Sequence, residues 1–255
     1  MKVEIKDIAG KILFSHEVEG NTVAKTIEKA LASGVSLENA DFENAHLMGA
    51  KLAGANLTGA NFSRAALFRV DFTNAILKNA NFSRGSLAGV NMSGADLTGA
   101  NLSRAVLEIG TLGQANLSHS DLTYAVLDAA DLTGASLSHA NLGKSRCRRT
   151  SFAQTDCTHA RFDGADLVSN DFAKADLADA SMVKTALRGS NFTDARLARA
   201  NLTDATVYRV EFVRTDLKEA VFSGAEFTDV NLTDAGMSEN ALSAVRMKEV
   251  ILKRL

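Results

Sequence analysis

A bulky apolar residue or cysteine occupies every fifth position of this chain, without interruption, from Leu37 to Leu242. Two places before each lies a second, smaller residue, which is usually Ala. A period of five would spiral the bulky residues around an α-helix and, being odd, would place them on alternate faces of a flat strand. The chain must therefore turn once per repeat, and such an unbroken repeat predicts a solenoid.

The repeated unit reads Ala-(Asp/Asn)-Leu-x-x, as in ADLTG from Ala95 to Gly99 and ANLTG from Ala55 to Gly59. This unit resembles that of the pentapeptide-repeat family over roughly residues 35–244. The resemblance implies an all-β fold, a right-handed, four-sided parallel β-helix with one pentapeptide per side and about ten and a half coils of twenty residues. In that fold the central Leu or Phe and the preceding Ala point inward.

The residue types at the other repeat positions also have physical explanations. Asp or Asn often precedes the bulky residue, where a short polar side chain can bond nearby backbone. Gly recurs two places after it, as at Gly49 and Gly99, where φ is expected to be positive. In one coil the inward residues alternate small and large, which favours core packing over a disulfide because opposite walls should lie about 10 Å apart. These residues are Cys147, Phe152, Cys157 and Phe162.

The two ends of the chain depart from the repeat. Residues 1–34 predict a hairpin around Ala9-Gly10 and a helix over Asn21 to Ala32, together an N-terminal cap. Residues 245–255 form either a helix or a terminal strand, and serve either as a second cap or, as the resemblance to quinolone-resistance members implies, as a homodimer contact. The apolar candidates for that contact are Val245, Met247, Val250, Ile251, Leu252 and Leu255.

Composition excludes several classes of protein. The net charge is −2, and the two cysteines both lie at core positions, so no disulfide framework is expected. No apolar run approaches the ~20 residues of a membrane span, and the N-terminus lacks the apolar core of a signal peptide. We therefore expect a cytoplasmic protein that does not enter a membrane.

A coil of twenty residues turns the sequence into a map of the surface, because residues twenty apart stack at about 4.8 Å. This stacking predicts one basic edge along the rod. The edge either binds an anionic partner or is simply a solvated surface. One part of it consists of Arg64, Arg84, Arg104, Tyr124, Lys144 and Lys184, and the neighbouring face adds Arg69, Arg146, Arg148, Arg149, Arg188 and Arg209. Exposed apolar side chains should collect on that face, namely Met48, Phe68, Val106, Ile109, Val126, Val168 and Tyr208.

The same map stacks His119, His139 and His159 on consecutive coils, with Asp179 next in line. Neighbouring imidazoles could chelate a transition metal, but three ligands in a line on an open wall make a poor tetrahedron. A surface ladder without metal is therefore the preferred interpretation, and the sequence predicts no cofactor.

No serine elbow, phosphate-binding Gly-rich loop, HExxH or CxxC motif is present, so enzyme activity is not expected. The leading hypothesis is a rigid scaffold that binds an unidentified protein. The resemblance to quinolone-resistance members offers a second, mimicry of DNA to bind DNA gyrase or topoisomerase. The positive charge of residues 61–150 and the unbroken repeat argue against it. Direct nucleic-acid binding through the basic edge is a third hypothesis.

Overall fold

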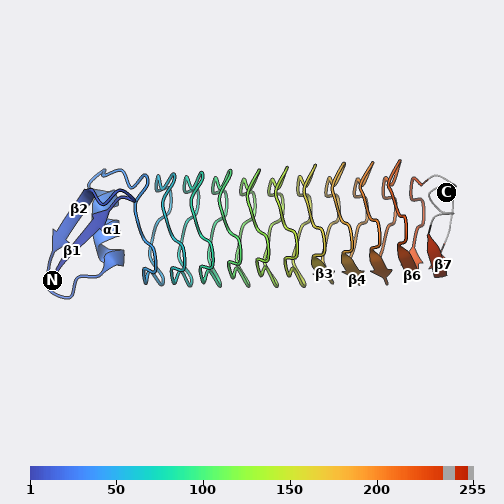
Figure 1. The fold of residues 1–255 in the computed structure, drawn as a ribbon, viewed down its shortest axis with the longest axis horizontal. Coiled ribbons are helices and arrows are strands. Elements are labelled where there is room, and N and C mark those ends of the chain that lie inside the picture. The colour runs from blue at the N-terminus through green and yellow to red at the C-terminus, as the bar shows by residue number, and fades with distance from the viewer. Residues whose placement is uncertain (238–244, 252–255) are drawn as a thin grey trace.

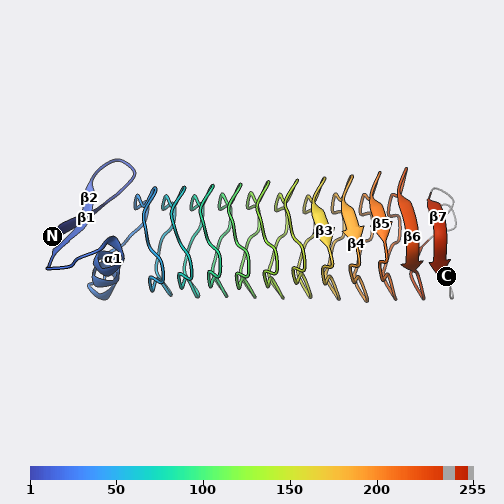
Figure 2. The ribbon, with the colours of Figure 1, turned by 90° about the horizontal axis from the view of Figure 1, so that it is seen from below.

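The chain forms a long column of stacked coils with a small hairpin and helix at its N-terminal end (Figure 1). These features come from a computed structural model, which describes residues 1–237 and 245–251. Seen from a second side, the coils keep the same stacking along the whole column (Figure 2). The predicted fold class, a right-handed, four-sided parallel β-helix with an N-terminal hairpin-helix cap, is confirmed.

Each coil is hydrogen-bonded to the coil before it and the coil after it through parallel bridges between residues twenty apart, such as Asn81 with Asn101. The Asn101 N–H donates to the Ala80 carbonyl (2.9 Å), and the Leu102 N–H donates to the Asp121 carbonyl (2.7 Å). Backbone groups that would otherwise be unsatisfied are thus paired along the column.

The interior of the column is filled by the residues that the five-residue period places inward. The central Leu and Phe side chains and most of the preceding Ala side chains are buried. Phe152, Phe172 and Phe192 form one stack along the column, with ring centroids 4.7 Å apart at both steps. Neighbouring rings at this offset attract one another in addition to burying apolar surface.

Short polar side chains hold many of the turns, as the sequence predicts. Asp96 Oδ1 accepts hydrogen bonds from the Thr98 backbone N–H (3.1 Å) and the Thr98 hydroxyl (2.6 Å). Gly99 has φ of 68°, and the Ala100 N–H donates to the Leu97 carbonyl (2.9 Å). The chain turns into the next wall because of three features: the bonded Asp96 side chain, the left-handed Gly99 and the bond from Ala100 to Leu97.

The N-terminal cap covers the first coil. It contains the antiparallel strands β1 (Lys2–Lys6) and β2 (Ile12–Glu17) and the helix α1 (Val23–Ala32). Helix α1 begins after Thr22, whose side chain accepts a hydrogen bond from the Lys25 N–H (3.2 Å). Ile27 is buried, and the Asp41 N–H of the first coil donates to the Lys6 carbonyl (2.7 Å).

One wall of the column becomes a regular parallel sheet towards the C-terminus, and we call it the strand wall. Near its start, the Ser190 hydroxyl donates to the Leu167 carbonyl (2.7 Å) and accepts from the Asn170 N–H (3.1 Å). In other repeats the corresponding N–H donates directly to the corresponding carbonyl and closes the turn, as Ala100 does to Leu97. Here the Ser190 hydroxyl stands between the Asn170 N–H and the Leu167 carbonyl, so the chain stays extended. The strands are β3 (Asp166–Val168), β4 (Ala186–Arg188), β5 (Thr206–Tyr208), β6 (Glu226–Asn231) and β7 (Arg246–Ile251).

The two cysteines are free and completely buried in the column. The Phe152 and Phe162 rings of the same coil meet edge to face, with centroids 5.9 Å apart, in agreement with the predicted alternation of small and large residues. Desolvation by burial raises the pKa of the Cys147 and Cys157 thiols to about 12.

These raised pKa values predict a loss of stability in alkali. An unfolded thiol releases its proton near pH 8.5, whereas the folded thiols keep theirs until about pH 12. The stabilisation is complete below pH 8.5 and falls above it, by about 1.4 kcal/mol per pH unit for each thiol. Urea unfolding at pH 8 and pH 10 should therefore show a larger loss for wild type than for the Cys147→Ala/Cys157→Ala variant. Equal losses would contradict the prediction.

Candidate interaction surfaces

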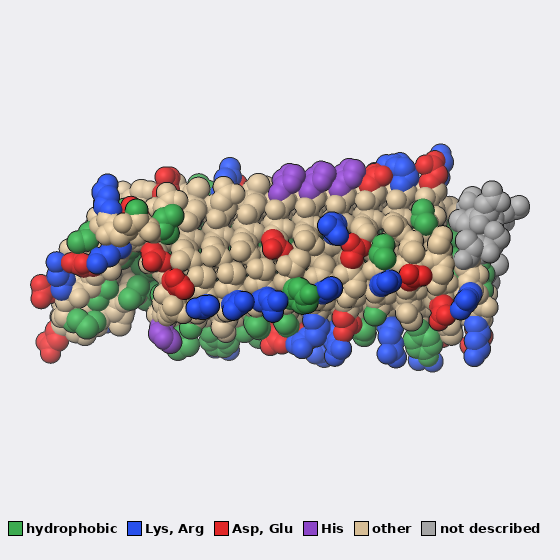
Figure 3. All heavy atoms as spheres, viewed as in Figure 1, with side chains coloured by type: hydrophobic (Ala, Val, Ile, Leu, Met, Phe, Trp, Pro, Cys, Tyr) green, Lys and Arg blue, Asp and Glu red, His purple; other side chains and the backbone are tan. Residues whose placement is uncertain are grey.

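The basic row consists of Arg64, Arg84, Arg104, Tyr124, Lys144 and Lys184, and it follows one corner of the column. Each member lies two places after a buried central residue, where the backbone is left-handed, and φ is 59° at Arg84 and 60° at Arg104. All six side chains are exposed at this corner. Figure 3 shows a line of Lys and Arg side chains along the rod, below a wall that is mostly tan, the colour of the backbone and of side chains that are neither charged nor hydrophobic.

Most cations of the basic row have no acidic partner. At its N-terminal end, Arg64 lies 3.9 Å from Glu43. Within the part of the chain that the structure describes, no carboxylate lies within 4.0 Å of the charged groups of the other four cations. These four are Arg84, Arg104, Lys144 and Lys184.

Tyr124 lies between two of these cations. The Arg104 guanidinium lies 4.9 Å from the centroid of the Tyr124 ring, and the Lys144 ammonium lies 5.4 Å from it. Lys144 Nζ also donates a hydrogen bond to Tyr124 Oη (3.1 Å). This hydrogen bond and the positive charges of Lys144 and Arg104 lower the pKa of the Tyr124 phenol, as expected where the potential is positive.

Several arginines of the C-terminal coils are paired, in contrast to most of the basic row. Arg196 lies 3.0 Å from Asp176, and Arg199 lies 2.6 Å from Asp179, which is in each case the residue one coil earlier. Arg214 is likewise paired with Asp194, twenty residues before it (2.6 Å). We did not predict these pairs, although a search for opposite charges twenty residues apart would have found them.

The strand wall combines paired and unpaired arginines. Arg146 contacts both Glu108 (2.9 Å) and Asp128 (2.8 Å), and Arg148 contacts Asp166 (2.7 Å). Arg149 and Arg188 have no acidic partner among the described residues. Part of the predicted basic face is therefore neutralised by its own neighbours.

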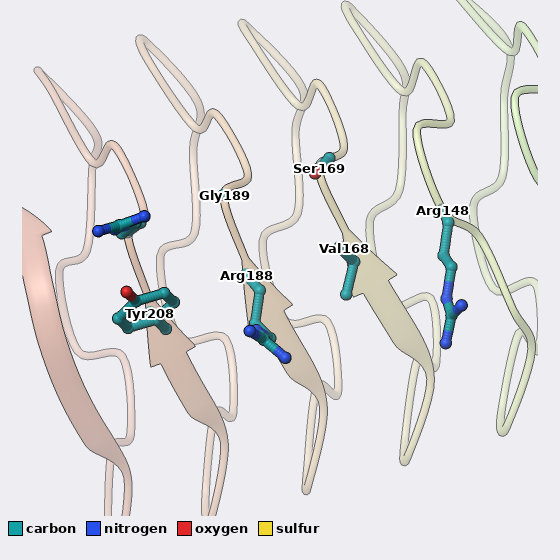
Figure 4. A pocket seen from close by; sticks show the side chains of 7 residues that line it. Arg148, Val168, Ser169, Arg188, Gly189 and Tyr208 are labelled. Carbon is teal, nitrogen blue, oxygen red and sulfur yellow. The ribbon is translucent and has the colours of Figure 1, made fainter.

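An open hollow of about 410 Å³ lies on the strand wall. Figure 4 shows Arg148, Val168, Arg188 and Tyr208 on successive coils along it. Two guanidiniums lie near the Tyr208 ring, with Arg188 at 5.6 Å and Arg209 at 5.0 Å from its centroid. Val168 supplies an apolar side chain to a hollow whose polar groups are mostly cationic.

Exposed apolar side chains extend this surface towards the N-terminus. Met48 is 68% exposed, Phe68 is 38% exposed and Ile109 is 60% exposed. Ile109 also has φ of 53°, in the left-handed region that a β-branched side chain rarely adopts. The other predicted apolar members of this face, Val106, Val126, Val168 and Tyr208, are half-buried.

The three predicted histidines form a stack on another corner, visible as three neighbouring purple side chains in Figure 3. The ring centroids are 5.0 Å apart between His119 and His139 and 4.7 Å apart between His139 and His159, with the planes nearly parallel. Nitrogen lone pairs lie in the ring planes, so one ion at about 2.0–2.1 Å cannot meet two of them in this arrangement. The described residues contain no group of three or more His, Cys, Asp or Glu side chains placed to hold a metal ion.

Four of the predicted dimer candidates, Val245, Met247, Val250 and Ile251, lie on or beside β7, which pairs with β6 in the twenty-residue register. Val245 and Val250 pack against the core, whereas Met247 and Ile251 are exposed. Leu252 and Leu255 lie outside the described residues, and homodimer formation through this segment stays a prediction.

No helix in the described part of the chain is both long and apolar enough to cross a membrane. A search of curated proteins finds no significant match. Among solved structures, the chain is similar to HetL, a pentapeptide repeat protein involved in heterocyst differentiation regulation from the cyanobacterium Nostoc sp. strain PCC 7120. The two are 29% identical with a TM-score of 0.50, and the match covers 83% of this chain and 93% of HetL.

Two other solved structures share less with the chain. One is a trypsin-treated form of QnrB1, a plasmid-mediated fluoroquinolone resistance protein, with 19% identity, a TM-score of 0.36, and coverage of 64% of this chain and 90% of that chain. The other is a pentapeptide repeat protein from the Arabidopsis thaliana thylakoid lumen, with 27% identity, a TM-score of 0.32, and coverage of 42% and 71%. The family model of pentapeptide repeats matches in 8 copies that run from residue 29 to residue 248. The chain therefore belongs to the pentapeptide repeat family.

Proposed function

We propose that the protein is a non-catalytic interaction rod and that its strand wall binds a protein partner. The observation that carries this proposal is the combination, on one wall, of exposed apolar side chains with an open, arginine-lined hollow. Met48, Phe68 and Ile109 lie in line with the hollow around Tyr208. Tyr, Met and Arg side chains are enriched in protein interfaces and at their energetic centres.

The neighbouring wall, which carries Asn81 and Asn101, offers much less to a partner. Its polar side chains bond to one another and to their own backbone, as when Asn81 Nδ2 donates to Asn61 Oδ1 (3.1 Å) and Asn81 Oδ1 accepts from the Ser83 N–H (3.1 Å). A partner that covers these satisfied groups gains little, because it must remove water from them without supplying better hydrogen bonds.

The backbone beneath the strand wall is tied to the coils on both sides, so the binding groups are held in place before the partner arrives. Such preorganisation reduces the entropy lost on binding. We propose a role in regulation or assembly, of the same general kind as that of HetL, which is involved in heterocyst differentiation regulation.

DNA mimicry towards a topoisomerase is a weaker proposal for this chain. A mimic of the DNA backbone needs a row of free negative charges. The carboxylates of Asp176, Asp179 and Asp194 in the C-terminal coils are instead paired with arginines at 2.6–3.0 Å.

Affinity capture from the native host tests the protein-binding proposal. The strand-wall variant Met48→Ser/Phe68→Ser/Ile109→Asn removes exposed apolar groups, and the control Ile76→Ser/Val221→Ser removes similar groups from other walls. We expect one partner to be retained by wild type and the control and reduced more than about tenfold by the strand-wall variant, as for loss of interface hot spots. Retention by the strand-wall variant, with both variants folded by circular dichroism, would reject this wall as the binding surface.

A further inference from the structure

The basic row gathers like charges, and apart from Arg64 beside Glu43 its cations have no acidic partner among the described residues. Arg84 and Arg104 occupy equivalent positions on adjacent coils, and the ladder spacing of about 4.8 Å keeps their backbones close. Elsewhere on the same rod, equivalent positions carry opposite charges, as at Asp179 and Arg199. A row of unpaired cations on a rigid backbone is suited to a ligand that supplies negative charges in a line.

The shape of the row restricts that ligand further. Four coil steps separate Arg64 from Lys144, a span of about 19 Å parallel to the rod axis. The row lies on a convex corner beside a wall of short polar side chains, so the ligand must be extended and narrow. An extended single polyanionic strand can follow such a line, with several of its charges each near one cation.

An aromatic side chain in the middle of the row identifies the ligand class. Tyr124 is 46% exposed, and its neighbours Arg104 and Lys144 lie on either side of it along the row. Cationic tracks with an exposed aromatic ring are typical of proteins that bind single-stranded nucleic acid, because the cations contact phosphates and the ring stacks on a base.

We propose that the basic row binds single-stranded nucleic acid, with phosphates on Arg64, Arg84, Arg104 and Lys144 and a base on Tyr124. This site lies at the corner next to the strand wall and does not depend on the protein-binding role proposed above. The phosphate contacts are independent of base identity, so little sequence specificity is expected.

Fluorescence anisotropy with a labelled oligothymidylate of about 12 nucleotides tests the proposal. We expect saturable binding at low salt that weakens as salt increases, with a log–log slope of about −0.7 for each contacted phosphate. The variant Arg84→Gln/Arg104→Gln should lose at least about tenfold in affinity and reduce the magnitude of the slope by about 1.4. The control Arg196→Gln/Arg199→Gln removes the same charge from paired arginines and should change affinity less than about twofold.

The substitution Tyr124→Leu separates stacking from charge. It should weaken binding about tenfold while leaving the salt slope unchanged, because no phosphate contact is removed. Absence of saturable binding at the lowest salt would overturn the proposal, as would equal losses in the two double variants. Equal affinity for polyglutamate of similar length, with no effect of Tyr124→Leu, would assign the row to an acidic protein instead.

Discussion

Replacing Phe172 by Asp is expected to abolish the folded column around that residue. The Phe172 ring is completely buried, and the rings of Phe152 and Phe192 stack on its two sides at 4.7 Å. Truncating such a ring to Ala costs about 3–5 kcal/mol, and a buried carboxylate without a cation adds further cost. A loss of this size is comparable with the total stability of a folded domain, about 5–15 kcal/mol, so the coils next to residue 172 should not remain folded. Urea unfolding followed by circular dichroism should show a reduced folded signal and a lower midpoint than wild type.

The substitution should also have a local effect, which limited proteolysis can detect. Coils of a solenoid contact only their neighbours, so the defect should separate the column into two parts that unfold independently. Limited proteolysis should then cleave near residue 172 and not at the distant Phe62 stack. The control Phe172→Leu preserves an apolar side chain and should cost less than about 2 kcal/mol. A wild-type urea midpoint for Phe172→Asp would contradict the inward placement of the repeat residues.

The sequence alone was sufficient to predict the coil, because a period of five leaves few ways to bury every central residue. It also located the left-handed positions through Gly49 and Gly99, whose φ values are 67° and 68°. It did not show that Ile109 shares this conformation with φ of 53°. The hydrogen-bonded ladder imposes one backbone path on every repeat, so the local preference of a single residue is overruled.

Features that depend on contacts between coils were harder to predict. The extension of β3 follows from the Ser190 hydroxyl, which accepts from the Asn170 N–H (3.1 Å) on the preceding coil. The sequence showed only a serine where Ala is usual. Likewise, the basic edge was predicted as one surface, although the structure divides it into cations paired with carboxylates, such as Arg146 and Arg148, and cations without an acidic partner, which include most of the basic row. Whether a cation is paired depends on the charge of the side chain one coil away, and the composition of the chain does not give the order of charges.

Removing residues 1–34 is expected to turn the protein into a self-associating species while its coils remain folded. The cap pairs the backbone of the first coil, where the Ile8 N–H donates to the Asn39 carbonyl (2.9 Å) and the Asp41 N–H donates to the Lys6 carbonyl (2.7 Å). It also buries Leu37. Without the cap these strand-edge groups and the end of the apolar core face water, and uncovered edges pair with other chains. Size-exclusion chromatography with light scattering should detect oligomers whose circular dichroism spectrum still reports β structure.

Two single substitutions distinguish loss of the cap from a general effect of changing the N-terminus. Ile27 of α1 is completely buried, so Ile27→Asp should detach the cap and produce the same oligomers in the full-length chain. Val18 follows β2 and is 46% exposed, so Val18→Asp makes an equal chemical change without breaking a buried contact and should remain like wild type. If the truncated chain and Ile27→Asp both elute as wild type does, the cap does not protect the end of the column. If Val18→Asp also forms oligomers, the association arises from the altered hairpin surface and not from an exposed coil.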